Sequence, residues 1–122
     1  MTTLVPYLTF HHGGESLRFL VEALGFEVVG EQRGDDGVVH AELRRGDALV
    51  MGGDGEARAG AAPGLYLVVD DVDAVFARAT AAGAEVVHEP EETEWGTRRA
   101  RVRDLDGHEW SLGTYQPGHQ AW

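Results

Sequence analysis

Apolar residues change their spacing along the first half of the chain, and the change predicts a strand, a helix and three further strands. Leu4 to Phe10 alternates as a strand does, whereas Glu15 to Leu24 repeats with the period of a helix and is followed by Gly25. The apolar stripe of this helix comprises Leu17, Leu20, Val21 and Leu24. The three further strands are expected at Phe26 to Arg33, Val38 to Arg44 and Ala48 to Met51.

The second half repeats the same order of elements. Leu65 to Val69 predicts a strand, and Val72 to Ala82 predicts a helix that ends at Gly83. Strands are then expected at Ala84 to Glu89, Thr97 to Arg103 and Glu109 to Tyr115.

Short echoes in the sequence support a duplication. Gly25 to Glu31 (GFEVVGE) is echoed by Gly83 to Glu89 (GAEVVHE), a displacement of 83 − 25 = 58 residues. Tyr7 to Phe10 is echoed by Tyr66 to Val69, a displacement of 66 − 7 = 59. We therefore predict an α+β fold of two tandem βαβββ modules, whose curved mixed sheet surrounds a cavity. Within this single domain, 1–52 and 65–115 are the modules, 53–64 is a linker and 116–122 is a tail.

Composition narrows the chemistry. The 122 residues fit one domain of about 100 to 200 residues. The absence of cysteine excludes disulfides and thiolate sites, and the absence of lysine excludes Schiff-base chemistry on this chain. With 10 basic against 21 acidic residues, the net charge of −11 argues against a nucleic-acid partner and either favours a cationic ligand or keeps the protein dispersed. No basic leader or run of about 18 apolar residues is present, so we expect a cytoplasmic protein without a membrane partner.

A family resemblance follows from the repeat and its turns. Two βαβββ modules, Gly25-Phe26 after the first helix and Arg103-Asp104-Leu105-Asp106-Gly107-His108 before the last strand resemble the vicinal oxygen chelate superfamily. This group includes glyoxalase I, extradiol dioxygenases and the bleomycin-resistance proteins. Leu105 replaces the proline of the family's usual Asp-Pro-Asp-Gly turn. The segment Trp110 to Tyr115 is most similar to the bleomycin-resistance-like branch.

The resemblance also implies where metal ligands would stand. In metal-dependent members, the first and last strands of each module supply His, Gln or Glu side chains. The corresponding positions here are Val5, Met51, Leu65 and Ser111. None of these is a plausible ligand for zinc, nickel or iron, so the resemblance implies a member with no metal or other cofactor.

Strand alternation predicts which side chains face the concave side of the sheet. Val39, Ala41 and Leu43 are expected to pack on a helix, which leaves His40 and Glu42 facing the cavity. By the same rule Ala100, Val102, Trp110 and Leu112 belong to the core. The predicted ligand-binding residues are Tyr7, His40, Glu42, Met51, Trp95, Arg101, Glu109 and Ser111.

Several of these residues have alternative interpretations. His40 and Glu42 could be a general base with its orienting carboxylate, two ligands of a displaced metal site assisted by Glu109, or a histidine paired across the sheet. Trp95 could stack on a ligand, or anchor a loop or a dimer interface. Arg101, with Arg99, could bind an anion or only neutralise nearby carboxylates.

Three functional hypotheses result. The first is a metal-free protein of the bleomycin-resistance type that binds a small aromatic, cationic or antibiotic-like molecule. The alternative is a metal-dependent lyase, isomerase or dioxygenase with a displaced metal site. A third is a module that regulates or pairs with another protein. Because members of the superfamily commonly dimerise, a homodimer is expected.

Overall fold

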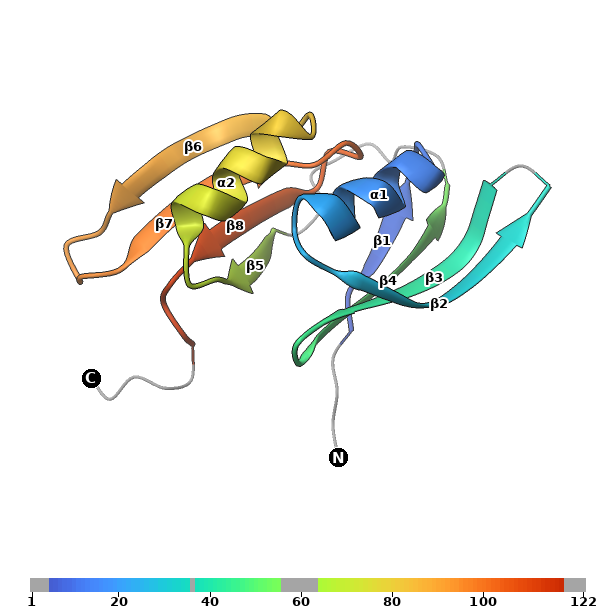
Figure 1. Cartoon of the computed structure of the whole chain (residues 1–122), viewed down its shortest axis with the longest axis horizontal. Helices are drawn as coiled ribbons and strands as arrows, with labels where there is room; N and C mark the ends of the chain where they lie inside the picture. The colour runs from blue at the N-terminus through green and yellow to red at the C-terminus, as the bar shows by residue number, and fades with distance from the viewer. Residues whose placement is uncertain (1–4, 36, 56–63, 118–122) are drawn as a thin grey trace. The chain divides into compact units, whose positions relative to one another are not determined.

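The computed structural model describes residues 5–35, 37–55 and 64–117 of the chain. The chain divides into two compact units, Met1–Ala61 (unit 1) and Ala62–Trp122 (unit 2). Each unit contains one strand, one helix and three more strands in that order (Figure 1). The prediction of two tandem βαβββ modules is therefore confirmed.

Unit 1 forms a four-stranded mixed sheet in the order β1-β4-β3-β2. Successive hairpins make β2, β3 and β4 antiparallel, and β1 joins the far side of β4 in parallel. Gly46 makes the turn between β3 and β4 with a φ of 56°, a conformation that glycine adopts without strain. The elements are β1 (Tyr7–Phe10), α1 (Gly14–Glu22), β2 (Glu27–Gly34), β3 (Gly37–Arg45) and β4 (Ala48–Asp54).

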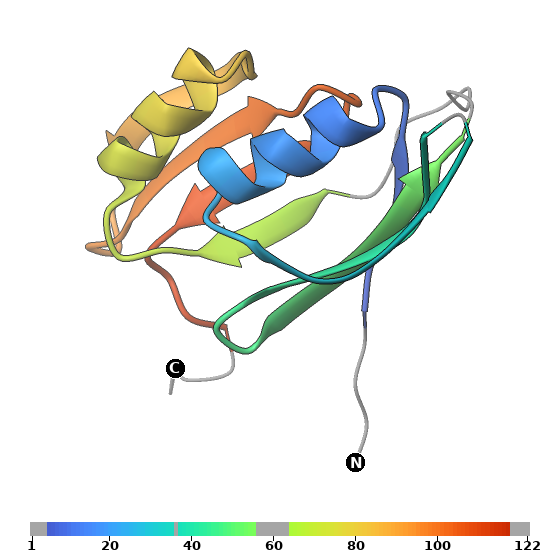
Figure 2. The same cartoon turned by 45° about the vertical axis from the view of Figure 1, so that its right-hand side comes forward.

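Helix α1 lies on one side of this sheet (Figure 2). Buried apolar residues of the helix and of the strands make up the core of unit 1. Leu17, Leu20 and Leu24 are buried as predicted. Val21, by contrast, is 38% exposed, and Phe19 is buried in its place. The buried stripe is therefore rotated around the helix relative to the prediction.

A β-bulge in β3 overturns one predicted core position. Gln32 pairs with His40 and the next residue, Arg33, pairs with Val38, so Val39 is an extra residue without a partner in β2. As a result Val38 is fully buried and Val39 is 54% exposed, so the prediction that Val39 packs on the helix is wrong. Ala41 and Leu43, beyond the bulge, are buried as predicted.

Unit 2 has the same topology, with the sheet order β5-β8-β7-β6. Asp71 begins its helix as the N-cap, because its carboxylate accepts the backbone N–H of Ala74 at 3.0 Å. Trp110 and Leu112 are buried in the core as predicted. The elements are β5 (Leu65–Val68), α2 (Val72–Ala81), β6 (Glu85–Glu92), β7 (Arg98–Arg103) and β8 (Glu109–Gly113).

The register of β5 corrects another prediction. Leu65 pairs with Trp110, and Tyr66 pairs with Ser111. Leu65 therefore points to the same side of the sheet as the buried Leu67, so it cannot share a face with Ser111. Tyr66, and not Leu65, lies beside Ser111, so Leu65 does not stand at the chelating position that the resemblance implied for it.

The end of β4 lies beyond the predicted end of the first module. Strand β4 extends to Asp54 and so includes the first two residues of the predicted linker, while 56–63 lie outside the described residues.

Among the described helices, none has the length and apolar character needed to cross a membrane.

Candidate functional site: the open sheet faces

Each unit has an open face, which we define as the side of its sheet that does not carry the helix. On the open face of unit 1, Tyr7, Met51 and Glu42 lie side by side on β1, β4 and β3. The Tyr7 side chain is conspicuous because the residue is 57% exposed although its neighbours in the strand, such as Leu8, are buried. The structure thus brings together predicted site residues from three strands.

An aromatic pair and a hydrogen bond organise this face. The rings of Tyr7 and His40 are stacked, with centroids 6.0 Å apart and planes 28° apart. His40 Nε2 and Glu42 Oε2 form a hydrogen bond of 3.0 Å, which orients the imidazole. Gly53, on the strand between the two rings, leaves the room for this arrangement, since a Cβ there would lie 3.0 Å from the Tyr7 hydroxyl. Four predicted site residues therefore form one cluster in unit 1.

The open face of unit 2 brings together three more predicted site residues. Ser111 lies between Tyr66 and Arg101 on adjacent strands. Arg101 Nε donates a hydrogen bond of 3.0 Å to Ser111 Oγ. Its NH1 lies 3.8 Å from Glu109 Oε1, beyond hydrogen-bond distance.

Tyr66 belongs to this face, and sequence reasoning missed it. Its hydroxyl donates to the backbone carbonyl of Tyr115 at 2.9 Å, and partial burial raises the pKa of the phenol above its ordinary value. A Cβ at Gly113 would overlap the Tyr66 hydroxyl. The echo of Tyr7 in Tyr66 was the signal that could have placed this residue.

The other arginines of β7 on this face are already paired with carboxylates. Arg99 donates to Glu91 at 3.0 Å. Arg103 donates to Glu85 at 2.9 Å and to Glu109 at 2.8 Å. Hydrogen bonding from Arg103 lowers the pKa of Glu109, so this carboxylate is held in its charged form by Arg103. Arg99 and Arg103 are therefore each matched by at least one acidic side chain.

Trp95 lies in the turn between β6 and β7 and is 76% exposed. The turn itself is well ordered by hydrogen bonds. Thr93 Oγ1 accepts the backbone N–H groups of Trp95 at 3.3 Å and of Thr97 at 3.2 Å, and it lies 2.7 Å from Thr97 Oγ1. The exposed indole is therefore carried on a supported turn.

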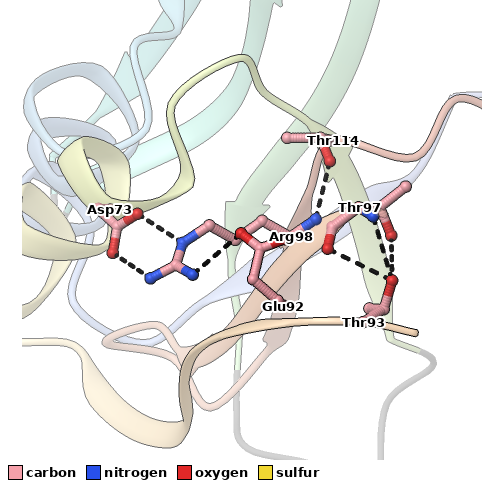
Figure 3. Close-up of polar contacts among 6 residues, drawn as sticks. All are labelled: Asp73, Glu92, Thr93, Thr97, Arg98 and Thr114. Atoms are coloured by element: carbon pink, nitrogen blue, oxygen red, sulfur yellow. Dashed lines mark hydrogen bonds and ion pairs between the residues drawn. The ribbon is translucent and has the colours of Figure 1, made fainter. Parts of the chain in front are cut away.

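The end of β7 next to this turn is held to α2 by Arg98, as Figure 3 shows. Arg98 donates to both carboxylate oxygens of Asp73, at 2.6 and 2.9 Å, and to Glu92 at 3.2 Å. This arrangement lowers the pKa of Asp73 and raises that of Arg98. The backbone N–H of Arg98 also donates to Thr114 Oγ1 at 2.9 Å.

In the described residues, one group of three side chains has the spacing to hold a cation. Asp104, Asp106 and His108 each offer an atom within 4.8 Å of the others. Asp104, however, already accepts three hydrogen bonds: Oδ1 from the backbone of Asp106 at 3.0 Å and of His108 at 2.9 Å, and Oδ2 from the Trp110 indole at 2.8 Å. We interpret the group as the scaffold of the β7–β8 turn.

His108 is the titratable part of that turn. It is 9% exposed, and its Nδ1 lies 3.3 Å from Asp104 Oδ2 as an ion pair rather than a well-aligned hydrogen bond. The Asp104 carboxylate raises the pKa of His108, against the opposing effect of burial. Sequence reasoning gave His108 no role, because a partner in a turn cannot be seen in hydrophobic spacing.

The residues at the chelating positions do not fit a metal. Met51 and Ser111 hold the chelating positions in the last strands of the two units. Val5 holds the first chelating position of unit 1, just before β1. The repeat displacement of 59 that relates Tyr7 to Tyr66 puts Gly64, and not Leu65, in the place equivalent to Val5. In the described part of unit 1, no third His, Cys, Asp or Glu joins His40 and Glu42 in a ligand group. Glu109 belongs to unit 2, where it is held by Arg103.

Comparison with known proteins agrees with this fold. The family model described as "Glyoxalase/Bleomycin resistance protein/Dioxygenase superfamily" matches residues 10–112. The chain belongs to this superfamily. Uncharacterized protein Rv0887c of Mycobacterium tuberculosis is 37% identical to this chain, over 90% of this chain and 72% of its own length. An uncharacterized protein of Mycobacterium bovis is also 37% identical and is covered over 81% of its length.

Solved structures extend the comparison. TioX from Micromonospora sp. ML1 is 30% identical, with a TM-score of 0.75 over 95% of this chain and 100% of its own. The fosfomycin resistance protein FosX from Mesorhizobium loti has a TM-score of 0.73 at 21% identity, over 96% of this chain and 95% of its own. At that identity FosX shows only that the glyoxalase superfamily fold is shared.

Proposed function

We propose that this glyoxalase superfamily protein is a metal-free small-molecule-binding protein that takes up an aromatic, antibiotic-like ligand on its open sheet faces. The observation that carries the proposal is the exposed Tyr7–His40 stack, in which Glu42 fixes the imidazole at 3.0 Å. A flat aromatic surface with an oriented polar group beside it suits an aromatic ligand, because stacking and one directional hydrogen bond can act together.

Three features support binding rather than metal chemistry. The chelating positions carry Val5, Gly64, Met51 and Ser111, whose side chains are poor ligands or absent. Met51, beside Tyr7, is a polarizable side chain that adapts to the shape of a ligand. The equivalent position of unit 2 places Tyr66, which is 45% exposed, beside Ser111. These properties favour the bleomycin-resistance-like branch of the superfamily.

Sequestration of such a ligand would take place in the cytoplasm and in a homodimer. Apolar surface on the open faces, such as Leu49 at 37% exposure, is available for a second copy to bury. Light scattering at micromolar concentration is expected to give the mass of two chains. A single-chain mass would contradict the homodimer.

Binding is tested by thermal shift against glycopeptide antibiotics, aromatic natural products and simple aromatic metabolites. We expect at least one aromatic compound to raise the melting temperature. Tyr7→Ala should weaken its binding by about tenfold, since a stacked aromatic contributes about 1 kcal/mol or more beyond its buried area. Val21→Ala is the matched control, because Val21 is 38% exposed on α1, away from the open face. The proposal fails if no compound binds, or if Tyr7→Ala binds as well as the control.

The alternative is a metal-dependent lyase, isomerase or dioxygenase with a displaced metal site. The observation in its favour is that His40 Nε2 and Glu42 Oε2 lie 3.0 Å apart on an exposed face, where one cation could contact both. Elemental analysis and calorimetric titration with zinc, nickel, iron and manganese test it. One metal ion per chain, lost in His40→Ala and Glu42→Ala, would support the enzyme. Absence of binding for all four metals would exclude this site.

A further inference from the structure

The three arginines that β7 places on the open face of unit 2 differ in how fully they are neutralised. Arg103 is paired with two carboxylates and Arg99 with one. Arg101, between them, has no carboxylate within hydrogen-bond distance in the described part of the chain. Arg101 forms only a long ion pair with Glu109, whose Oε1 lies 3.8 Å from NH1 and whose other oxygen accepts a hydrogen bond from Arg103.

Ser111 holds the Arg101 guanidinium in a defined orientation. Its hydroxyl accepts from Nε at 3.0 Å, so the side of the group nearest the strand is occupied. Within the described residues, the terminal amino groups make no recorded hydrogen bond, and the side chain is 49% exposed. A planar guanidinium whose terminal amino groups make no hydrogen bond can donate two parallel hydrogen bonds to a carboxylate or a phosphate.

The surroundings of Arg101 add an apolar wall. Tyr66 lies on the other side of Ser111 and is 45% exposed. Its hydroxyl is committed to the Tyr115 carbonyl, so the ring rather than the hydroxyl is what Tyr66 offers to a ligand. Val68, two residues along the same strand face, is 38% exposed. A ligand seated here would meet a cation next to aromatic and aliphatic surface.

We infer that Arg101, oriented by Ser111, is an anion-binding subsite and that the ligand is an organic anion with its carboxylate or phosphate beside an aromatic body. This inference rests on the proposed function and specifies the ligand class. It runs against the net charge of −11, which by itself favours a cation. The local arrangement prevails because charge-assisted hydrogen bonds act at contact distance, whereas charges far from the site are screened by salt.

The test is a nuclear magnetic resonance titration of the ¹⁵N-labelled protein at pH 7 and constant ionic strength. The probes are benzoate, phenyl phosphate, inorganic phosphate, benzyl alcohol and benzylamine. Benzoate or phenyl phosphate should shift the Arg101 and Ser111 amide signals and bind about tenfold more tightly than benzyl alcohol. Inorganic phosphate should bind more weakly than phenyl phosphate, because it lacks the ring that contacts Tyr66.

Variants identify the group responsible. Arg101→Gln should weaken binding of the two aromatic anions by about tenfold and leave benzyl alcohol unchanged, and Arg101→Lys should fall between, since lysine lacks the planar fork. The control is the double variant Arg99→Gln/Glu91→Gln. It removes an arginine of similar exposure, 55% against 49%, from the same strand while keeping the net charge. Its binding should stay within about twofold of the parent.

The outcomes separate this inference from the proposed function. If benzyl alcohol binds and the anions have no advantage, or if Arg101→Gln binds benzoate as well as the parent does, the anion subsite is wrong while the binding function stands. Benzylamine that binds as tightly as benzoate and shifts the Arg101 and Ser111 amide signals would also overturn the subsite. If no probe binds at either open face and the wider ligand panel gives no thermal shift, both the subsite and the proposed function fail.

Discussion

On the open face of unit 1 a tyrosine stands beside methionine and glutamate, and at the same strand positions of unit 2 a tyrosine stands beside serine and arginine. The strand order and the pairing of the neighbouring positions are the same in both units. The helix sides also agree, with buried apolar residues in each. The comparison teaches that the core maintains the shared backbone, whereas the open face is free to acquire different chemistry.

The tyrosines show how closely the backbone is shared. Tyr7 reaches over Gly53 and Tyr66 over Gly113, so each ring uses the space left by a glycine in the last strand of its unit. The polar surroundings nevertheless diverge, because His40 binds Glu42 in one unit while Arg101 binds Ser111 in the other. One face therefore offers an imidazole and a carboxylate, and the other offers a cation.

The largest expected effect is a difference in stability between variants in the last hairpin of each unit. Asp104→Ala removes the acceptor for the backbone of Asp106 and His108 and for the buried Trp110 indole. We expect the free energy of unfolding to fall by about 3 to 4 kcal/mol, since buried donors are left without partners. Asp47→Ala, at the exposed turn of unit 1, should change it by less than about 0.5 kcal/mol. Urea denaturation measures both, and equal losses would contradict the assigned role of Asp104.

A second pair of variants sharpens the comparison of the glycines. A Cβ at Gly53 would lie 2.5 Å from the Val39 carbonyl oxygen, which is backbone, whereas a Cβ at Gly113 meets the movable end of Tyr66. Gly53→Ala should therefore cost about 2 to 3 kcal/mol of unfolding free energy, and Gly113→Ala about 1 kcal/mol.

Removing the tyrosines provides the control for these variants. Tyr66→Ala should abolish the extra cost of Gly113→Ala, since no ring then needs to move. Tyr7→Ala should leave most of the cost of Gly53→Ala in place, because the Val39 carbonyl remains. Double-mutant cycles in urea measure the coupling between each tyrosine and its glycine. Equal coupling energies in the two units would contradict the expected difference.

The smallest expected effect is a pH dependence that His108 of unit 2 supplies. Asp104 raises the pKa of His108 above its unfolded value, so the stabilisation is fully present below the unfolded pKa of about 6.5 and is lost as the pH rises through the folded value. The free energy of unfolding should thus fall slightly from pH 6 to pH 8 relative to His108→Gln. Denaturation curves of both proteins at the two pH values measure it. A parallel dependence in both would show that His108 is not the source.

The backbone plan was predictable from the sequence because it depends on periodicity. A period of two residues predicted every strand, and a period of 3.6 residues predicted both helices. The helices end within three residues of Gly25 and Gly83, which were predicted to follow them. The side on which a residue lies was less predictable. The bulge at Val39 reverses the alternation locally, and nothing in the spacing announces it.

The site was predictable only where residues lie on the same face of a sheet. His40 with Glu42, and Arg101 with Ser111, came from alternation, and the structure brings each pair together. The assignment of Leu65 failed by one residue, and a shift of one exchanges the two faces of a strand, so Tyr66 was missed. The contacts of Asp104 with Trp110 depend on how a turn folds back on a core side chain, which no linear pattern records.

The indole of Trp110, buried in unit 2 and hydrogen-bonded to Asp104, has a use as an optical reporter. All three tryptophans of the chain, at 95, 110 and 122, belong to unit 2, and unit 1 has none. Tryptophan fluorescence during denaturation therefore follows unit 2 alone, while circular dichroism follows both units. Coincident curves would mean that the two halves melt as one cooperative body, and separated curves would mean that the duplicated halves have kept independent stabilities.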